Sequence, residues 1–256
     1  MLLFHEIFII LPPMQTKTDA IVLHTIKYGE QKLIVDMFTR ELGRQSFVVP
    51  ISKSGHSKLK KQYFQPLTLL TIEADVRQPS SLQKLRDATL LQPLTSLLAE
   101  PAKLAIGLFM AEFLWHALRN EQCNVQLFDY VRLSIEWLED RQADYANFHL
   151  VFLMHLSRFL GFFPNLTDAG QKSACFDLRA GTFCASPPPH HEWLAPEEAR
   201  RIRLMMSMDY PTMHHLRLSR SARHRTLEII ETYYRLHLPA FPELRSLPVL
   251  HELFSA

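Results

Sequence analysis

Lysines concentrate in a short stretch of this 256-residue chain, between residues 53 and 61. Lysine side chains neutralise phosphates and release the cations condensed on a nucleic acid, which is the main source of sequence-independent affinity. Bases stack on aromatic rings, and Phe47, Tyr63 and Phe64 lie nearby in the sequence. The stretch therefore predicts contacts with a nucleic-acid backbone; the alternative is a solvated loop whose aromatic neighbours fill a core. Its lysines are Lys53, Lys58, Lys60 and Lys61.

Charge is unevenly distributed along the chain, although the formal net charge is only +2. Residues 16–62 hold nine basic residues against four acidic ones, whereas residues 80–199 hold nine against fourteen. Residues 200–225 are basic again, with seven arginines against Asp209 alone. Because the position of the cations decides which surface attracts an anionic partner, we expect two basic zones on either side of an acidic middle.

Four arginines of the second zone precede or enter the first turn of a predicted helix. Cations at this end oppose the helix dipole and cost roughly 0.3–1 kcal/mol each. A bound phosphate or carboxylate would offset that cost, because exposed backbone N–H groups and arginine forks together form an anion site. The alternative is that these arginines pair with the acidic middle of the chain. They are Arg217, Arg220, Arg223 and Arg225.

Two cysteines and two histidines between residues 175 and 191 invite comparison with a zinc site. Zinc sites usually contain four nitrogen or sulfur ligands arranged as two close pairs. Here eight residues separate Cys175 from Cys184, and His190 and His191 are adjacent in a proline-rich segment. We therefore predict a metal-free hairpin with buried thiols.

The sequence contains none of the common motifs for hydrolysis or group transfer. G-x-S-x-G, the P-loop, G-x-G-x-x-G and H-E-x-x-H are all absent, and seven glycines are too few for several phosphate-cradling loops. The carboxylates of Glu139 and Asp140, like those of Glu197 and Glu198, are adjacent on helices and so diverge in direction. We therefore expect neither an enzyme nor a bound cofactor.

Short β-like segments follow one another between residues 18 and 76. They are rich in β-branched and aromatic side chains and are separated by glycines or polar turns, which is typical of a small barrel or sandwich. Five strands would make an OB-type barrel. We predict an extension over residues 1–15 and an OB-fold domain over residues 16–80. The segments are 20–28, 32–39, 45–51 and 66–74.

After residue 80 the apolar period becomes helical, which predicts a larger all-α domain over residues 81–256 and an α+β fold overall. The segment 147–160 is apolar on all sides and stops before Gly161, so we expect it to be the central buried helix. A hairpin insertion is expected near residues 165–194. The predicted helices are 101–120, 125–141, 147–160, 196–208 and 221–238.

Three cysteines, an odd number, argue against a disulfide framework and favour a reducing compartment, so we expect a cytoplasmic protein. The apolar residues 1–13 lack a basic start and a small-residue cleavage site, and they are too short to span a bilayer. Met14 begins a more ordinary N-terminus, where translation could start.

The segment 16–50 resembles the opening of RecO proteins, a family of recombinational-repair mediators. The family pattern is a strand ending in I-V-L, a Y-x-E turn at Tyr28 and Glu30, and F-T-R-x-x-G from Phe38 to Gly43, followed by a basic loop. The tail 241–254 (FPELRSLPVLHELF) is similar to the closing helices of the family. The resemblance covers both ends and, by helical pattern only, the middle.

The resemblance implies an OB-fold followed by a helical domain that binds single- and double-stranded DNA in recombinational repair. It implies annealing of complementary strands and loading of recombinase onto DNA coated by the single-stranded DNA-binding protein. Lys32, Arg40, Arg44 and the lysines of residues 53–61 would contact DNA. Many members carry four cysteines in a zinc ribbon, whereas this chain keeps only Cys175 and Cys184, which again predicts no metal.

The family also implies two protein partners, RecR and the acidic, apolar C-terminal tail of the single-stranded DNA-binding protein. The four C-terminal arginines would bind either DNA or that tail, which requires a cationic, partly apolar groove. We expect nucleoid association and no membrane partner. A different class stays open: a helical scaffold or regulator whose barrel binds a protein rather than nucleic acid.

Overall fold

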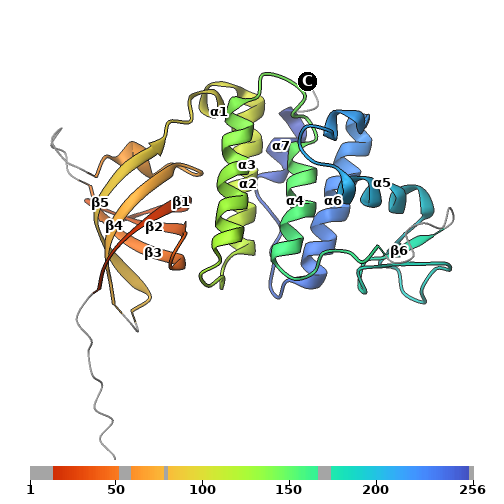
Figure 1. The fold of residues 1–256 in the computed structure, drawn as a ribbon, viewed down its shortest axis with the longest axis horizontal. Coiled ribbons are helices and arrows are strands. Elements are labelled where there is room, and N and C mark those ends of the chain that lie inside the picture. Colours follow the sequence, from red (N-terminus) through yellow and green to blue (C-terminus); the bar gives the residue numbers. More distant parts are fainter. Residues whose placement is uncertain (1–13, 52–58, 78–79, 167–173, 254–256) are drawn as a thin grey trace, which may run out of the picture. The chain divides into compact units, whose positions relative to one another are not determined.

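The computed structural model describes residues 14–51, 59–77, 80–166 and 174–253 (Figure 1). The chain divides into two compact units. The first unit holds the chain up to Pro93 together with residues 118–128, and the second holds residues 94–117 together with the chain from Asp129 onward. Strands make up the first unit and helices dominate the second, so the predicted α+β fold is confirmed.

Five strands of the first unit close into a barrel in the order β1-β2-β3-β5-β4. The pair β3–β5 is parallel and the other neighbouring pairs are antiparallel. A closed five-stranded barrel of this kind is an OB-fold, as predicted. A short 3-10 helix, η1 (Lys61–Phe64), precedes β4. The strands are β1 (Met14–Tyr28), β2 (Lys32–Thr39), β3 (Gly43–Pro50), β4 (Leu69–Val76) and β5 (Leu82–Gln92).

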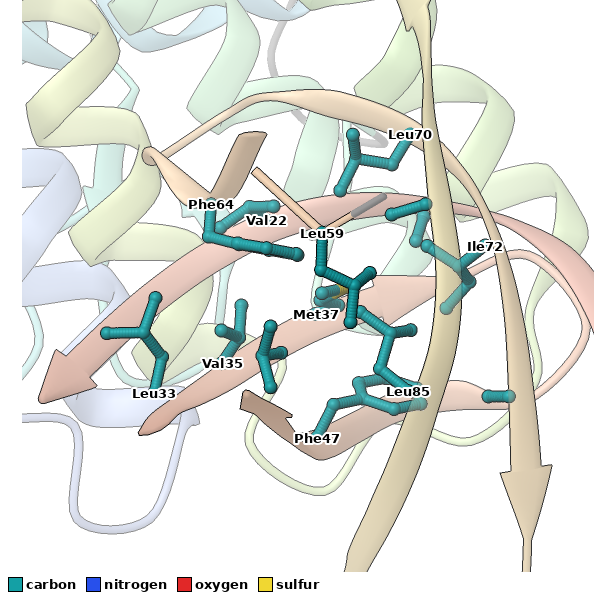
Figure 2. Close-up of a cluster of buried hydrophobic side chains, with 14 residues drawn as sticks. Val22, Leu33, Val35, Met37, Phe47, Leu59, Phe64, Leu70, Ile72 and Leu85 are labelled. Carbon is teal, nitrogen blue, oxygen red and sulfur yellow. The ribbon is translucent and has the colours of Figure 1, made fainter. Parts of the chain in front are cut away.

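Alternating side chains of the strands fill the barrel. Leu33, Val35 and Met37 of β2 point inward at every second position, as the pleat requires, and all are buried. Figure 2 shows them packed with Phe47 and Phe64 in a single cluster. The residues between them, such as Lys32 and Ile34, therefore lie on the outer surface of the barrel.

The barrel extends past residue 80, where the helical domain was expected to begin. β5 runs from Leu82 to Gln92 and pairs with both β4 and β3. Its buried positions include Leu85, the polar Gln83 and the small Ala88. Because β5 contributes little apolar area to the core, its period of two is weak in the sequence, and the expected boundary was wrong by about one strand.

A β-bulge in β1 changes which side chains face outward. The pairing with β2 shifts register between Val22 and His24, so Thr25 lies opposite the inward-facing Val35. The Thr25 hydroxyl donates to the carbonyl of Phe64 at 2.8 Å, within the barrel. Ile26 and Tyr28 consequently point outward, because a one-residue shift exchanges the two faces of a strand.

The hairpin between β2 and β3 packs tightly against residues 118–128 of the same unit. Gly43 has a positive φ of 69°. A Cβ at this position would lie 2.4 Å from the carbonyl carbon of Gln122, and the N–H of Arg44 donates to the carbonyl of Glu121 at 3.0 Å. Only glycine fits both the backbone conformation and the close approach.

The second unit consists of helices and one small sheet (Figure 1). All five predicted helices are present, within about three residues of their expected ends. α1 was not predicted, because it is only five residues long, whereas α7 lies in the tail that resembles the closing helices of the family. The helices are α1 (Thr95–Ala99), α2 (Pro101–Ala117), α3 (Val125–Asp140), α4 (Phe148–Phe159), α5 (Pro196–Ser207), α6 (Arg220–His237) and α7 (Leu247–Leu253).

Helix α4 is the central buried helix, as predicted. Nine of its twelve residues are buried. It packs against α5 and α6, and aromatic rings join it to α3, with Tyr130 stacked on Phe152 at a centroid distance of 5.5 Å. The Tyr234 hydroxyl of α6 donates to the carbonyl of Leu153 at 2.7 Å. In the part of the chain that the structure describes, no helix is long and apolar enough to cross a membrane.

The predicted hairpin insertion is present as part of a three-stranded sheet in the order β7-β6-β8. Its strands are β6 (Cys175–Asp177), β7 (Thr182–Cys184) and β8 (Trp193–Leu194). Cys175 and Cys184 lie directly opposite each other, and both are free thiols.

Candidate nucleic-acid interface

The outward-facing residues of β1, β2 and β3 form two rows across the strands. Tyr28 lies opposite Lys32, and Lys32 lies opposite Pro50. The next row is apolar and consists of Ile26, Ile34 and Val48. We call this surface the outer face; it consists of Tyr28, Lys32, Pro50, Ile26, Ile34 and Val48.

A groove of about 470 Å³ adjoins the outer face. The end of β3 and the start of β5 form part of its wall, together with the connection between β4 and β5. Three cations line it: Lys32, Arg77 and Lys84, all exposed. In OB-folds the face of strands 2 and 3 and the connection between strands 4 and 5 are the surfaces that bind oligonucleotides. We call the groove in this protein the barrel groove. Its lining residues are Lys32, Val48, Pro50, Asp75, Arg77, Ser80, Leu82, Gln83 and Lys84.

The acidic residue that lines the groove with these cations, Asp75, is already paired. Asp75 is 8% exposed, and its carboxylate lies 2.6 Å from Nε of Arg86. Within the described residues, no carboxylate lies within 4.0 Å of the charged groups of Lys32, Arg77 or Lys84. The barrel groove therefore carries a net positive charge that an anion can neutralise.

Gln83 holds the connection between β4 and β5 in place. Its side chain is buried, at 3% exposure. Oε1 accepts a hydrogen bond from the N–H of Arg77 at 2.8 Å, while Nε2 donates to the carbonyls of Arg77 at 3.1 Å and Ser80 at 2.7 Å. All three of these side-chain hydrogen bonds are directed at this turn, and they fix the backbone that carries Arg77.

The structure describes three of the five lysines predicted to contact DNA. Lys32 is in the barrel groove. Lys60 and Lys61 are exposed beside η1, with the Lys60 ammonium 5.8 Å from the centre of the Tyr63 ring. Lys53 and Lys58 fall outside the described residues.

The two predicted arginines of the barrel differ in their surroundings. Arg40 is 37% exposed, with its guanidinium 3.5 Å from Glu41. Arg44 is only 15% exposed; it pairs with Asp36 at 3.1 Å and donates to the carbonyl of Arg119 at 3.2 Å. Burial lowers the pKa of Arg44, and the charge of Asp36 opposes that shift. Arg44 therefore ties β2, β3 and residues 118–128 together, and its guanidinium is directed inward.

The aromatic residues expected to stack bases are mostly interior. Phe47 and Phe64 are 0% and 3% exposed and belong to the core cluster (Figure 2). Tyr63 is partly buried and packs against the same cluster. For Phe47 and Phe64, the alternative that aromatic neighbours of the basic stretch fill a core is therefore the correct one. Tyr28, which the sequence marks only as part of the Y-x-E turn, is 58% exposed; its exposure was not predicted, because the bulge that turns it outward leaves no sequence signal of its own.

Arg217 precedes α6, Arg220 and Arg223 lie in its first turn, and Arg225 lies in its second turn; the N-cap is Ser219. Arg217 and Arg220 are exposed. Arg223 is half-buried and donates to Asn147 at 3.1 Å; burial lowers its pKa, and the charge of Arg220 lowers it further. Arg225 donates to Glu198 at 2.8 Å, which raises its pKa, and lies 3.7 Å from Glu228. Pairing with acids, the alternative considered from the sequence, thus holds for Arg225.

The described residues around the small sheet contain no group of three or more side chains that could hold a metal. The His190 ring lies 3.3 Å from Asp177 and 3.5 Å from Glu192. Burial raises the pKa of the Cys184 thiol. His191 is exposed. The cysteines and histidines are therefore not assembled as ligands.

Taken together, the fold and this site define a class: proteins that join a cationic OB-type barrel to a helical unit. Two family models match the chain, "Recombination protein O N terminal" over residues 14–94 and "Recombination protein O C terminal" over residues 98–248. The chain belongs to the RecO family.

Its relatives share most of their length with it. The DNA repair protein RecO of Phocaeicola vulgatus is 48% identical over 242 residues, and that of Bacteroides fragilis is 48% identical over 244 residues. The protein of the same name from Flavobacterium psychrophilum is 33% identical over 243 residues. In each case the match covers 94% of this chain and 100% of the relative.

Proposed function

We propose that the protein binds DNA through the outer face and the barrel groove and acts as a mediator in recombinational repair. The observation that carries the proposal is the cluster of Lys32, Arg77 and Lys84 in one groove, beside an acid, Asp75, that is already paired with Arg86. Phosphate is the anion that such a groove would neutralise along an extended chain, with release of counterions. Membership of a family whose curated members are named DNA repair proteins supports this choice.

The test is binding of a fluorescent 20-nucleotide oligonucleotide, followed by anisotropy at low salt. Replacing Lys32, Arg77 and Lys84 together by glutamate should weaken binding by at least tenfold, and equally for unrelated sequences, because backbone contacts carry no sequence information. If the unmodified protein does not bind at low salt, or if the triple variant binds like it, the proposal fails.

The matched control is Lys17→Glu. Lys17 is an exposed lysine of the same barrel, 3.8 Å from Glu73 and outside the groove. This change alters the net charge of the barrel without altering the groove, so it should leave affinity within about twofold. Lys60→Glu with Lys61→Glu tests whether the contact surface extends to η1.

The exposed arginines before α6 are proposed as a second contact, for DNA or for the acidic tail of the single-stranded DNA-binding protein. Arg217 and Arg220 are solvent-accessible, and no acidic residue occupies the first turn of α6. Titration with a synthetic acidic tail peptide distinguishes the two ligands. If the peptide is the ligand, Arg217→Ala with Arg220→Ala weakens its binding and leaves DNA binding unchanged; Arg225→Ala, which loses the pair with Glu198, is the comparison.

As a mediator, the protein would anneal complementary strands and help load recombinase on coated single strands, with RecR as a second partner and without catalysing a reaction itself. Such a role places it in the cytoplasm, at the nucleoid. Strand annealing in the presence of the cognate single-stranded DNA-binding protein tests it. A scaffold whose barrel binds only a protein would show neither annealing nor salt-dependent oligonucleotide binding.

A further inference from the structure

We infer that Tyr28 is a base-stacking platform, so that the outer face selects single-stranded over double-stranded nucleic acid. The inference rests on the proposed function and names the residue that reads the strandedness of the ligand. It is carried by the exposure of the ring, by its position opposite Lys32, and by the bulge that turns it outward.

The exposure of Tyr28 is not required by the fold. The ring is 58% exposed, and Ile26, two residues earlier on the same face, is 46% exposed. The position opposite the inward-facing Val35 is taken by Thr25, which is polar and half-buried, whereas Lys27 is exposed. Without the bulge the same strand would direct Ile26 and Tyr28 inward. The barrel thus places an aromatic ring in solvent and turns the polar Thr25 inward, the reverse of what stability alone favours.

Tyr28 and its neighbour Lys32 offer an aromatic ring and a cation side by side, which are the two groups that a single nucleotide can contact. Tyr28 and Lys32 are paired residues on adjacent antiparallel strands, so their Cβ atoms are about 4.5–5.5 Å apart and their side chains leave the same face. A nucleotide carries a flat base and a phosphate on one sugar. An aromatic ring next to a lysine can bind both parts at once, and Pro50 on the far side of Lys32 continues the row toward the groove.

Single strands are the occupant that these groups favour. A base exposes its flat face only when it is not stacked between neighbours, as in single-stranded DNA. A duplex would offer phosphates to Lys32, Arg77 and Lys84 but no free base face to Tyr28. Because every base has such a face, the contact is tolerant of sequence.

The experiment compares three 20-nucleotide probes: a thymidine oligonucleotide, an oligonucleotide of the same length made of abasic residues, and a blunt duplex. Tyr28→Ala should weaken binding of the thymidine probe by roughly tenfold, with little effect on the abasic probe or on the duplex. Tyr28→Phe, which retains the ring, should bind like the unmodified protein. Leu90→Ala removes a side chain that is 42% exposed elsewhere on the barrel and should change nothing.

The outcomes separate this inference from the proposed function. If Tyr28→Ala weakens all three probes equally, or none of them, the stacking role is wrong, even if the groove variant of Lys32, Arg77 and Lys84 still loses binding. If that groove variant binds normally as well, the proposed function itself is wrong. Thermal unfolding of each variant, which should match that of the unmodified protein, shows that the hairpin is intact.

Discussion

The side chain of Gln83 forms hydrogen bonds with both backbone groups of Arg77. Oε1 of Gln83 accepts from the Arg77 N–H at 2.8 Å, and Nε2 donates to the Arg77 carbonyl at 3.1 Å. The amide is buried in the barrel wall, whereas Arg77 is exposed in the groove. Gln83, whose side chain is only 3% exposed, thus sets the direction of the exposed groove residue Arg77. The barrel groove is therefore a preorganised surface, and its binding should depend on Gln83.

Gln83→Leu keeps the size of the side chain and removes all three hydrogen bonds to the turn. We expect affinity for a single-stranded oligonucleotide to fall about three- to tenfold, because Arg77 loses its fixed position. Unfolding in urea should show a loss of about 1–3 kcal/mol, since the Arg77 carbonyl and N–H lose buried partners.

The control for this prediction is Gln45→Leu. Gln45 is a partly buried amide of β3 that donates one hydrogen bond, to the carbonyl of Leu42 at 3.0 Å, and does not line the groove. It should lower stability by a smaller amount and leave affinity unchanged. Equal affinity losses in the two variants would show that the effect is general destabilisation rather than positioning.

Gly43→Ala should destabilise the barrel by at least about 2 kcal/mol. The new Cβ would meet the backbone of Gln122 at 2.4 Å, and alanine is strained at a φ of 69°. Gly29→Ala separates the two effects, because Gly29 has a φ of 65° but nothing within 4 Å of its added Cβ. Urea denaturation of both variants should show the larger loss for Gly43→Ala; equal losses would mean that the close approach to Gln122 has no energetic weight.

The sequence predicted the helices better than the strands, for a physical reason. In α4, side chains such as Phe152 and Leu156 are packed on all sides, and their apolar run stands out from the flanking segments. In β5, the buried Gln83 and the small Ala88 leave no such run. A buried segment can therefore be predicted from the sequence only when most of its buried residues are apolar.

The candidate site was only partly predictable. Lys32 was found as part of a basic segment, but Arg77 and Lys84 reach the same groove through the closure of the barrel by β3 and β5. The outward turn of Tyr28 depends on a register shift between Val22 and His24. Such tertiary relationships are not encoded by any local spacing. Arg44 looked like Lys32 in the sequence, and only its pair with Asp36 sets it apart.

The stability of the helical unit should fall because of Glu231 as pH rises from about 4.5 to about 7. Burial raises the pKa of this carboxyl from its ordinary 4.5 to about 7, and one of its oxygens has no hydrogen-bond partner among the described residues. Between these values the folded protein holds a proton that the unfolded chain has released, so the free energy of unfolding decreases with pH and the penalty is complete above pH 7.

Glu231→Gln removes this penalty. At pH 8 it should raise the free energy of unfolding by on the order of 1–3 kcal/mol, and near pH 4.5 it should have little effect. Urea denaturation at the two pH values measures the difference. An effect of Glu231→Gln that is the same at both pH values would contradict the buried, protonated state.

The most direct test of the central claim, that the barrel groove binds DNA phosphates, is the salt dependence of binding to a single-stranded oligonucleotide. The slope of log K against log salt concentration measures the number of phosphates neutralised, at about 0.7 per contact for single strands. Replacing Lys32, Arg77 and Lys84 together by alanine should reduce the slope by about 2, and Lys17→Ala should leave it unchanged. A triple variant with the slope of the unmodified protein would contradict the account.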